Sequence, residues 1–435
     1  MAVDDRFNKD FRHTDRDRFH VSRGEIVTGP VTDWATDFSH LDPRWTADPF
    51  PIMDDLRQRC PIAHTERFGG AWVPTRYEDI AAVAYDTENF SSRSVNVGNF
   101  RPPRDLAPIG ELPPITSDPP FHHGARKLLL PAFTKTAVAR LEPTTRAYCH
   151  SLIDGFEGRD VVDAAEEYAR RVPEQVIGDL LGIPQGDRTL FRELIANINR
   201  EDALDSRDEH VEQLSKMFVF LLAEIREHVK NPREDLITYL LNVELRGRKL
   251  DPNHIISMML LLFAAGIGTT TKAIGSSLWH LAGNPQDRER LVAEPELLLT
   301  AMEEFLRAFT PVTMARLVKD DMHWRGVDMK ADDWILLSFP AANRDPAQFD
   351  RAGEVIIDRE ANRHAAFGLG IHRCLGSHLA RMELRVALEV WLERIPEFSL
   401  QDPSTVVWGG RLARGPLCLP LRVDRRSQLT PGGPQ

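Results

Sequence analysis

The sequence predicts a mainly α-helical protein with a small β region. A long apolar segment over 251–282 carries a helix start signal at one end and a stop signal at the other. After Cys374, apolar residues recur at helical spacings of three and four as far as Val390. The clearest strand-like pieces are short and lie late in the chain, within 327–340 and 398–423. No repeat or linker divides these segments, so we expect one domain.

The first third of the chain is predicted to combine a polar arm, short elements and one long loop. Residues 1–44 are polar and weakly patterned, which indicates an arm over the surface. Residues 91–120 are rich in proline, glycine and arginine and have no period. We expect a long loop there, of the kind that often covers a binding site. Between them we expect a helix, a short strand and a second helix, over 49–59, 70–74 and 75–84.

Most of the remaining chain is predicted to be helical. Residues 125–245 form mostly helical segments, and 298–307 forms another helix. The long helix can begin with Asp251 as its N-cap and Pro252 in its first turn, and Gly283 with Pro285 would end it. The domain organisation we expect is an N-terminal arm (1–44), a single domain (45–425) and a flexible tail (426–435).

Composition excludes several classes of protein. The 435 residues are 42% hydrophobic and 27% charged, as in a soluble protein with a large core, and the net charge of -11 disfavours nucleic-acid binding. The four cysteines form no CxxC pair, which argues against a zinc site and suits a reducing compartment. The N-terminus is polar, and the longest apolar run, 255–267, is shorter than the roughly 20 residues of a membrane span. We therefore expect a cytoplasmic monomer without nucleic-acid or membrane partners.

The most informative motif surrounds Cys374. Residues 367–376 read FGLGIHRCLG, in which glycines permit tight backbone turns and a basic pair precedes the cysteine. The helix predicted after Cys374 would place the thiol near a helix N-terminus, where free N–H groups lower a thiol pKa. A lone cysteine is more often a small buried apolar residue than a ligand. The flanking residues favour the ligand in this case.

Two further motifs are ambiguous when taken alone. The centre of the long helix, 264–271, reads AAGIGTTT, and each glycine costs about 1 kcal/mol against alanine in a helix. Tight packing of another helix would explain it equally well. Glu304 and Arg307 share a helix face at a spacing of three, which usually means a solvated ion pair.

Together these motifs resemble those of the cytochrome P-450 superfamily, the heme-thiolate monooxygenases, in their soluble bacterial class I form. The resemblance covers about residues 49–423, with the three motifs in the family's order. It implies the cytochrome P-450 fold, a triangular helical heme-binding domain. It also implies heme b (iron protoporphyrin IX) as cofactor and dioxygen as cosubstrate, with Cys374 as the axial iron ligand, which is the metal site. A thiolate ligand donates electron density to heme iron and favours O–O cleavage.

The resemblance also implies roles for other residues. Thr269 matches the threonine that orients dioxygen and its protons, with Thr270 beside it. The acid that usually precedes this threonine is replaced by Gly268, so water, Thr270 or the substrate would have to deliver protons. Arg359 would join Glu304 and Arg307 in a structural cluster. The cofactor-binding residues would be Cys374, His122, Arg126, Arg316, His372, Phe367, Gly368, Gly376 and Ala265. The substrate pocket would contain Val95, Val97, Phe100, Ala264, Val312, Thr313, Met314 and Trp408.

The function implied is hydroxylation or O-demethylation of a small apolar organic substrate. Electrons from NAD(P)H would arrive through a ferredoxin reductase and a ferredoxin, because the chain has no room for a flavin or iron–sulfur domain. Two alternatives stay open. A peroxide-driven peroxygenase is favoured by Gly268 and disfavoured by Thr269. A non-enzymatic heme sensor or carrier would have little use for an oxygen-binding groove and a large lid.

Overall fold

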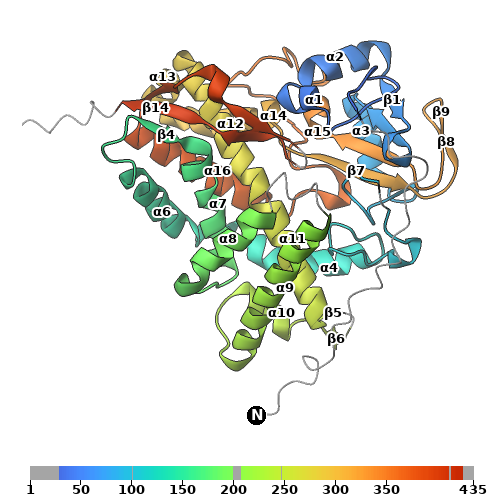
Figure 1. The fold of residues 1–435 in the computed structure, drawn as a ribbon, viewed down its shortest axis with the longest axis horizontal. Helices are drawn as coiled ribbons and strands as arrows, with labels where there is room; N and C mark the ends of the chain where they lie inside the picture. Colours follow the sequence, from blue (N-terminus) through green and yellow to red (C-terminus); the bar gives the residue numbers. More distant parts are fainter. Residues whose placement is uncertain (1–28, 100, 199–206, 246, 411–412, 425–435) are drawn as a thin grey trace, which may run out of the picture.

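The computed structural model describes residues 29–99, 101–198, 207–245, 247–410 and 413–424. Helices make up most of the molecule, and the largest sheet lies to one side of them (Figure 1). The helices are α1 (Pro43–Ala47), α2 (Phe50–Arg59), α3 (Tyr77–Tyr85), α4 (Phe121–Leu129), α5 (Lys135–Ala139), α6 (Glu142–Asp154), α7 (Arg171–Leu180), α8 (Arg188–Ile198), α9 (Arg207–Lys230), α10 (Leu236–Asn242), α11 (Pro252–Gly266), α12 (Gly268–Gly283), α13 (Pro285–Ala293), α14 (Leu298–Ala308), α15 (Phe339–Ala342) and α16 (Ser377–Arg394).

The largest sheet joins strands from distant parts of the chain. Its order is β1-β2-β10-β7-β3, and β10 pairs parallel to β2 and antiparallel to β7. A second sheet has the order β11-β14-β4, and three pairs form two-stranded ribbons. The strands are β1 (Ile62–Thr65), β2 (Ala71–Pro74), β3 (Phe90–Ser91), β4 (Val161–Asp163), β5 (Glu244–Leu245), β6 (Arg248–Lys249), β7 (Thr313–Val318), β8 (Met322–Trp324), β9 (Val327–Met329), β10 (Trp334–Ser338), β11 (Glu397–Leu400), β12 (Val407–Gly409), β13 (Gly415–Cys418) and β14 (Pro420–Asp424).

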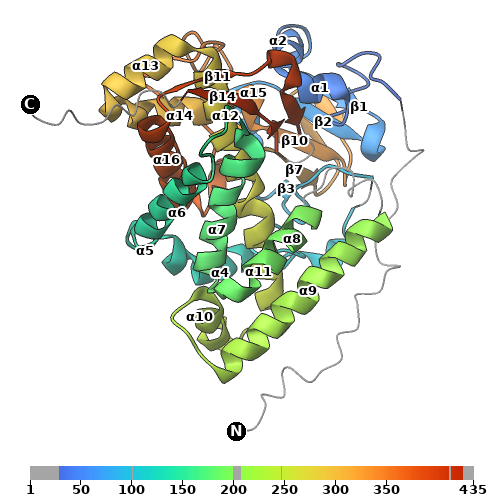
Figure 2. The same cartoon turned by 60° about the vertical axis from the view of Figure 1, so that its left-hand side comes forward.

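Most elements predicted from sequence are confirmed, and the mainly α fold class with them. Helices α2, α3 and α14 and strand β2 lie within a few residues of the predicted spans. Strand β7 was not predicted. Its sequence, TMARLV, lacks polar–apolar alternation because its last four residues are all buried. Long α9 runs along one side of the molecule with α8 against it (Figure 2).

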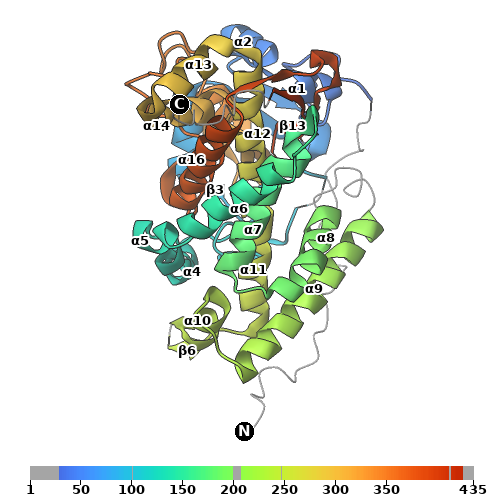
Figure 3. The ribbon, with the colours of Figure 1, turned by 90° about the vertical axis from the view of Figure 1, so that its left-hand side faces the viewer.

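The predicted central helix is interrupted. It consists of α11 and α12, which meet at Ile267 with φ −92° and ψ −62°. The hydroxyls of Thr269 and Thr271 donate to the carbonyls of Ala265 and Ile267, at 2.7 and 2.9 Å, and such bonds compete with the regular helix ladder. Asp251 caps the start, as predicted, by accepting from the Asn253 amide at 2.9 Å. Figure 3 shows the pair as one nearly straight column through the molecule.

The central helix pair also corrects an expectation about length. Taken as one unit, Pro252–Gly283 has 32 residues and is long and apolar enough to cross a membrane by composition. Fifty-six per cent of its most apolar window is buried inside the protein, which is typical of the core helix of a soluble protein. The sequence had suggested a run too short to span, because only 255–267 is continuously apolar.

The end of the predicted N-terminal arm packs against the body. Phe38 is buried against Trp45, with ring centroids 4.8 Å apart. Arg67 holds Asp37 through its Nε at 2.5 Å. Residues 29–44 therefore contribute to the core that also contains the largest sheet. Residues 1–28 and the predicted tail, 426–435, lie outside the described residues.

The long loop over 91–120 is mostly irregular, as predicted, and it is tied down by arginines. Arg93 and Arg104 both form ion pairs with Asp332, in the turn between β9 and β10. Arg101 donates from Nε to the Asp332 carbonyl at 2.5 Å. These three contacts fix the loop against the largest sheet.

Candidate functional site

A cavity of about 220 Å³ lies at the centre of the molecule. Its walls come from α4, the α11–α12 junction, the segment leading into β7, residues 366–376 and the start of α16. Most of its lining is apolar, as is usual for binding pockets. The structure thus brings together the Cys374 loop and the segment around Thr269, although Thr269 and Cys374 lie 105 residues apart in the chain.

The loop over 367–376 holds Cys374 on one wall. The Cys374 amide donates to the Phe367 carbonyl at 2.7 Å, which closes the loop on itself. Gly368 and Gly370 have φ of +69° and +68°. A Cβ on Gly370 would lie 2.3 Å from the Ala84 carbonyl oxygen, so only glycine fits this close approach to α3. The cysteine is therefore positioned by backbone geometry.

The Cys374 side chain has exposed surface, and that surface lines the cavity. The sequence predicted a lowered pKa for the Cys374 thiol, and this prediction is wrong for the polypeptide without heme. Withdrawal from water by the surrounding protein raises the pKa of Cys374, and it outweighs the Gly376 amide and the charges of Arg126 and Arg373, which lower it. Helix α16 starts only at Ser377, so its N-terminus acts on the thiol mainly through the Gly376 amide.

Basic side chains gather at another part of the cavity lining. Arg316, on β7, is buried, and its Nη1 donates to the Ala315 carbonyl at 2.8 Å. Burial lowers the pKa of Arg316 to about 10, and the charge of Asp118 only partly offsets this. Arg126 donates to the Arg373 carbonyl at 2.6 Å, and burial also lowers its pKa. Within the described residues, no carboxylate forms an ion pair with Arg126 or Arg316.

Two histidines complete this basic group. His122 and His372 have ring centroids 4.3 Å apart. Burial and neighbouring positive charges lower the pKa of His122 to about 4 and that of His372 to about 2. The His372 Nε2 lies 2.9 Å from the Ser92 hydroxyl, while the His122 Nε2 is buried without a partner in the described structure. The described residues therefore place two arginines and two histidines together without a carboxylate that pairs with either arginine.

On the α11–α12 side, small residues leave space in front of the central helices. Ala265, Gly266, Thr269 and Thr270 all line the cavity. The Thr269 hydroxyl donates to the Ala265 carbonyl at 2.7 Å, which leaves its lone pairs free to accept. Gly268 does not line the cavity, and a Cβ built on it meets nothing within 4 Å.

The Glu304–Arg307–Arg359 cluster lies behind the cavity and is fully buried at its centre. Arg307 donates to both carboxylate oxygens of Glu304 at 2.8 Å, and the side chains of both are 0% exposed. Arg359 donates to Glu304 at 3.0 Å, and Asn362 donates to it at 3.1 Å. The remaining Arg307 donors bind three carbonyls, those of Asn343, Ala352 and Glu354.

The predicted substrate-pocket residues are divided by the structure. Val95, Val312 and Met314 line the central cavity, and Val97 and Thr313 line a second, smaller cavity described below. Ala264 has exposed surface but is absent from both linings. Trp408 packs on Trp279, with ring centroids 5.1 Å apart, and lines neither cavity. Phe100 lies outside the described residues.

Sequence reasoning missed several lining residues. Glu383 of α16 lines the cavity, is buried with Oε2 unpaired, and has a pKa raised well above its usual range by that burial. The signal was its position four residues after Leu379, on the face that also carries Met382 and Val386. The apolar side chains that were missed include Leu129, Phe133, Ile177, Leu261, Leu262, Leu306 and Phe339.

These residues fit a heme group. A thiol on one wall can ligate iron, and Phe367 and Gly376 lie beside it in the same lining. Among the described residues, Arg126 and Arg316 form no ion pair and the His122 Nε2 has no hydrogen-bond partner, and two heme propionates would supply the missing negative charge and acceptors. Small residues on the α11–α12 wall leave space for dioxygen and substrate.

Comparison with known proteins agrees with this geometry. The sequence profile of the cytochrome P-450 family matches residues 188–406. The mycinamicin IV hydroxylase/epoxidase of Micromonospora griseorubida is 34% identical over 84% of this chain and 94% of its own length. The vitamin D(3) 25-hydroxylase of Pseudonocardia autotrophica is 31% identical over 87% and 95%. The solved structure of PksS, the cytochrome P-450 of bacillaene polyketide synthesis in Bacillus subtilis, superposes with a TM-score of 0.80 at 30% identity and covers 87% and 98% of the two chains.

Proposed function

The chain belongs to the cytochrome P-450 family and is a heme-thiolate monooxygenase, and from that premise we propose that it hydroxylates or O-demethylates a small, mainly apolar organic molecule. We further propose that it works as a cytoplasmic monomer with electrons from NAD(P)H, delivered by a ferredoxin reductase and a ferredoxin. The observation that carries the proposal is the single cavity in which Cys374, the anion-deficient basic cluster and an apolar wall meet.

Each group in the site has a task under this proposal. Heme b, when bound, supplies the iron that activates dioxygen for insertion of one oxygen atom into the substrate. Cys374 would hold the iron, and His122, Arg126, Arg316 and His372 would bind the propionates. Val95, Val312 and Met314 bind the substrate and exclude water from the reacting carbon. Thr269 accepts and donates hydrogen bonds on the wall where protons are needed.

The reactions of the relatives support the proposed chemistry at the level of reaction class. One is named for hydroxylation and epoxidation of mycinamicin IV and another for 25-hydroxylation of vitamin D(3). The substrate of this chain can be sought by titrating terpenes, methoxyaromatics, fatty acids and macrolides. A ligand that displaces water from iron shifts the spin state, and failure of every class to do so would count against a substrate pocket here.

Salt should slow electron transfer from the ferredoxin. Lys127 and Arg373 are exposed near the cysteine loop, and Arg126 is bonded to the Arg373 carbonyl, so positive charge gathers there in an otherwise acidic chain. Charge steering of this kind raises association rates by roughly 10- to 1,000-fold and weakens with ionic strength.

Arg373→Glu should therefore slow reduction by at least roughly tenfold at low salt. The rates are measured by stopped-flow mixing with reduced ferredoxin. Lys330→Glu, at an exposed site in the turn between β9 and β10, is the control and should leave the rate unchanged. A salt-independent rate would contradict docking at this face.

Thr269→Ala should uncouple the reaction. The reason is that Thr269 supplies the hydroxyl on the cavity wall, while Gly268 leaves no acid to share its task. Reduced cofactor would then be consumed while hydrogen peroxide accumulates in place of product. The measurement is product formed per NAD(P)H consumed, and Thr269→Ser, which keeps the hydroxyl, is the control. Unchanged coupling in Thr269→Ala would show that water delivers the protons instead.

Gly268→Asp extends this experiment. A Cβ at Gly268 meets no atom within 4 Å, so a side chain can begin at this position without a clash at its first atom. If Thr269 carries the proton relay by itself, the added carboxyl should raise coupling above wild type. No change would mean that proton supply does not limit turnover.

A peroxide-driven peroxygenase remains the second candidate, because no acid precedes Thr269. It predicts turnover with hydrogen peroxide alone at a rate equal to or above that with ferredoxin and reductase. The two rates are compared on the same substrate at equal enzyme concentration. Faster turnover with the ferredoxin system supports the monooxygenase.

A further inference from the structure

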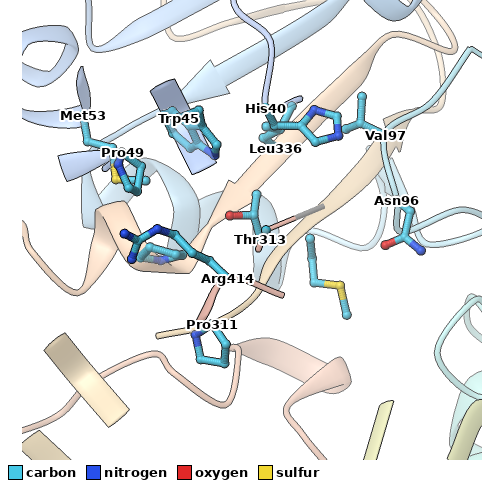
Figure 4. A pocket seen from close by; sticks show the side chains of 13 residues that line it. His40, Trp45, Pro49, Met53, Asn96, Val97, Pro311, Thr313, Leu336 and Arg414 are labelled. Atoms are coloured by element: carbon cyan, nitrogen blue, oxygen red, sulfur yellow. The ribbon is translucent and has the colours of Figure 1, made fainter. Parts of the chain in front are cut away.

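A second cavity, of about 50 Å³, lies beside the first. Figure 4 shows it between the N-terminal helices, the strands of the largest sheet and the segment that carries Arg414. Its apolar side chains include Trp45, Met53, Val97 and Leu336, and Arg414 lies among them. Nothing in the catalytic scheme above uses this cavity.

One extended segment, residues 311–314, separates the two cavities. Val312 lines only the larger cavity and Thr313 only the smaller one, as expected where successive side chains of an extended chain point to opposite sides. Pro311 and Met314 line both. The wall is thus one segment thick, and the unbranched, adaptable Met314 side chain forms part of it on both faces. Met314 is therefore a side chain whose rotamer would have to change for one elongated molecule to occupy both cavities.

Arg414 is a cation without a counter-ion among the described residues. It donates from Nε to the Thr46 carbonyl at 2.9 Å and from Nη2 to the Ala47 carbonyl at 2.6 Å. An arginine has five N–H donors, so the other three have no partner among the described residues. Its guanidinium lies 4.2 Å from the Trp408 ring centroid, and withdrawal from water lowers its pKa to about 10, with a partly opposing effect from the charge of Asp48.

Two buried arginines of this region, unlike Arg414, have carboxylate partners. Arg57 and Arg67 each form an ion pair with an aspartate, at 2.6 and 2.5 Å. The two arginines most strongly desolvated without such a pair at the cavities are Arg316, in the proposed propionate site, and Arg414. Arg344 also has a pKa lowered to about 10 and no ion pair among the described residues, but Arg414 differs from it in lining a cavity, where an anion from outside the chain can reach its guanidinium.

We infer that the smaller cavity binds the carboxylate of an elongated, otherwise apolar substrate, with Arg414 as counter-ion, while the reacting end of the substrate occupies the larger cavity. Thr313 adds a hydroxyl to the same lining (Figure 4). The small volume and the single arginine among the described lining residues suit a monovalent carboxylate better than a phosphate, which carries more charge and more acceptors. This inference rests on the proposed function, because it assigns the substrate class of that same site.

The first test compares acids with their methyl esters on the wild-type holoenzyme. Octanoate, dodecanoate and hexadecanoate are each titrated beside the matching ester, by calorimetry and by the spin-state shift. A charge-assisted hydrogen bond to the partly desolvated Arg414 guanidinium should make the affinity for the acid of matching length roughly tenfold to a hundredfold higher than that for its ester. Equal affinities for acid and ester at every length would overturn the assignment, and no variant is needed for that result.

The second test removes the cation. Arg414→Gln should reduce the acid-to-ester affinity ratio to about one, and Arg414→Lys should restore part of it because it keeps the charge. Arg344→Gln is the matched control, since Arg344 also lies over the Phe50 ring but lines neither cavity. It should leave the ratio unchanged. An unchanged ratio in a folded, heme-loaded Arg414→Gln would also overturn the assignment.

Failure of the carboxylate subsite and failure of the proposed function give different results. Both binding tests need no electron donor. If acids bind tightly but no ligand is turned over with ferredoxin and NAD(P)H, the proposed electron route falls and the subsite stands. If esters are turned over and acids bind no better than esters, the subsite falls and the proposed function stands.

Discussion

Replacing Cys374 by alanine is expected to abolish the red-shifted Soret band of the reduced carbon monoxide complex, together with all monooxygenase activity. The thiol is the only sulfur atom of a cysteine in the lining of the central cavity, among the described residues. Without it, iron loses the ligand that gives the band its position and promotes O–O cleavage. The measurement is the difference spectrum of the dithionite-reduced protein with and without carbon monoxide.

Cys60→Ala and Cys418→Ala are the matched controls for this experiment. Both thiols are half-buried and line neither cavity, so their removal should leave the band and the activity intact. Persistence of the red-shifted band in Cys374→Ala would assign the iron to another cysteine and contradict the site. The glycines of the loop make such a substitution informative, because the backbone around Cys374 holds its position without help from the side chain.

Loss of Glu304 or Arg307 should destabilise the protein by about 3–5 kcal/mol, the cost of leaving one charge of a buried pair without its partner. Both side chains are fully buried, so no water can replace the missing group. Glu304→Ala also strands Arg359 and the Ile356 amide, which donates to Glu304 at 2.8 Å. We expect both variants to accumulate poorly and to carry little heme, as measured by urea unfolding and by the ratio of heme to protein.

The surface pair Arg351–Glu354 provides the control. It has the same spacing of three residues, but both side chains are more than half exposed. Glu354→Ala removes a side chain and keeps the carbonyl that Arg307 binds, so it should not measurably lower stability. If Glu304→Ala retained wild-type stability and heme content, the buried cluster would have no structural role.

Local chemistry was enough to predict much of the site from sequence. The Cys374 loop, the weak helix centre near Thr269 and the Glu304–Arg307 spacing are short-range patterns, and each lies in a lining or cluster that the structure brings together. Capping by Asp251 was predicted for the same reason. The mainly helical fold class was predictable because helical periodicity is visible between residues only three or four positions apart in the sequence.

What could not be predicted depends on contacts between distant segments. Strand β7 is stabilised by pairing with β10 and β3, and its own sequence shows no alternation. The pKa of Cys374 is raised because protein from several elements surrounds it, although the local motif suggested the opposite. Trp408 was predicted to line the substrate pocket because it is apolar. In the structure its ring packs against Trp279 and the Arg414 guanidinium instead. Periodicity within one segment does not show which distant segments will pack against it.

The spread of the cavity lining along the chain has a consequence for biosynthesis. The residues that would hold heme begin at His122 and end at Gly376, and Gly370 fits only against the backbone of Ala84. At roughly 5–20 residues per second, the ribosome needs many seconds to pass from the first of these residues to the last. Until Cys374 is synthesised, the nascent chain lacks the residue that would ligate iron. Heme capture must therefore be among the last events after translation, and cells short of heme should accumulate an incompletely closed chain that proteases recognise.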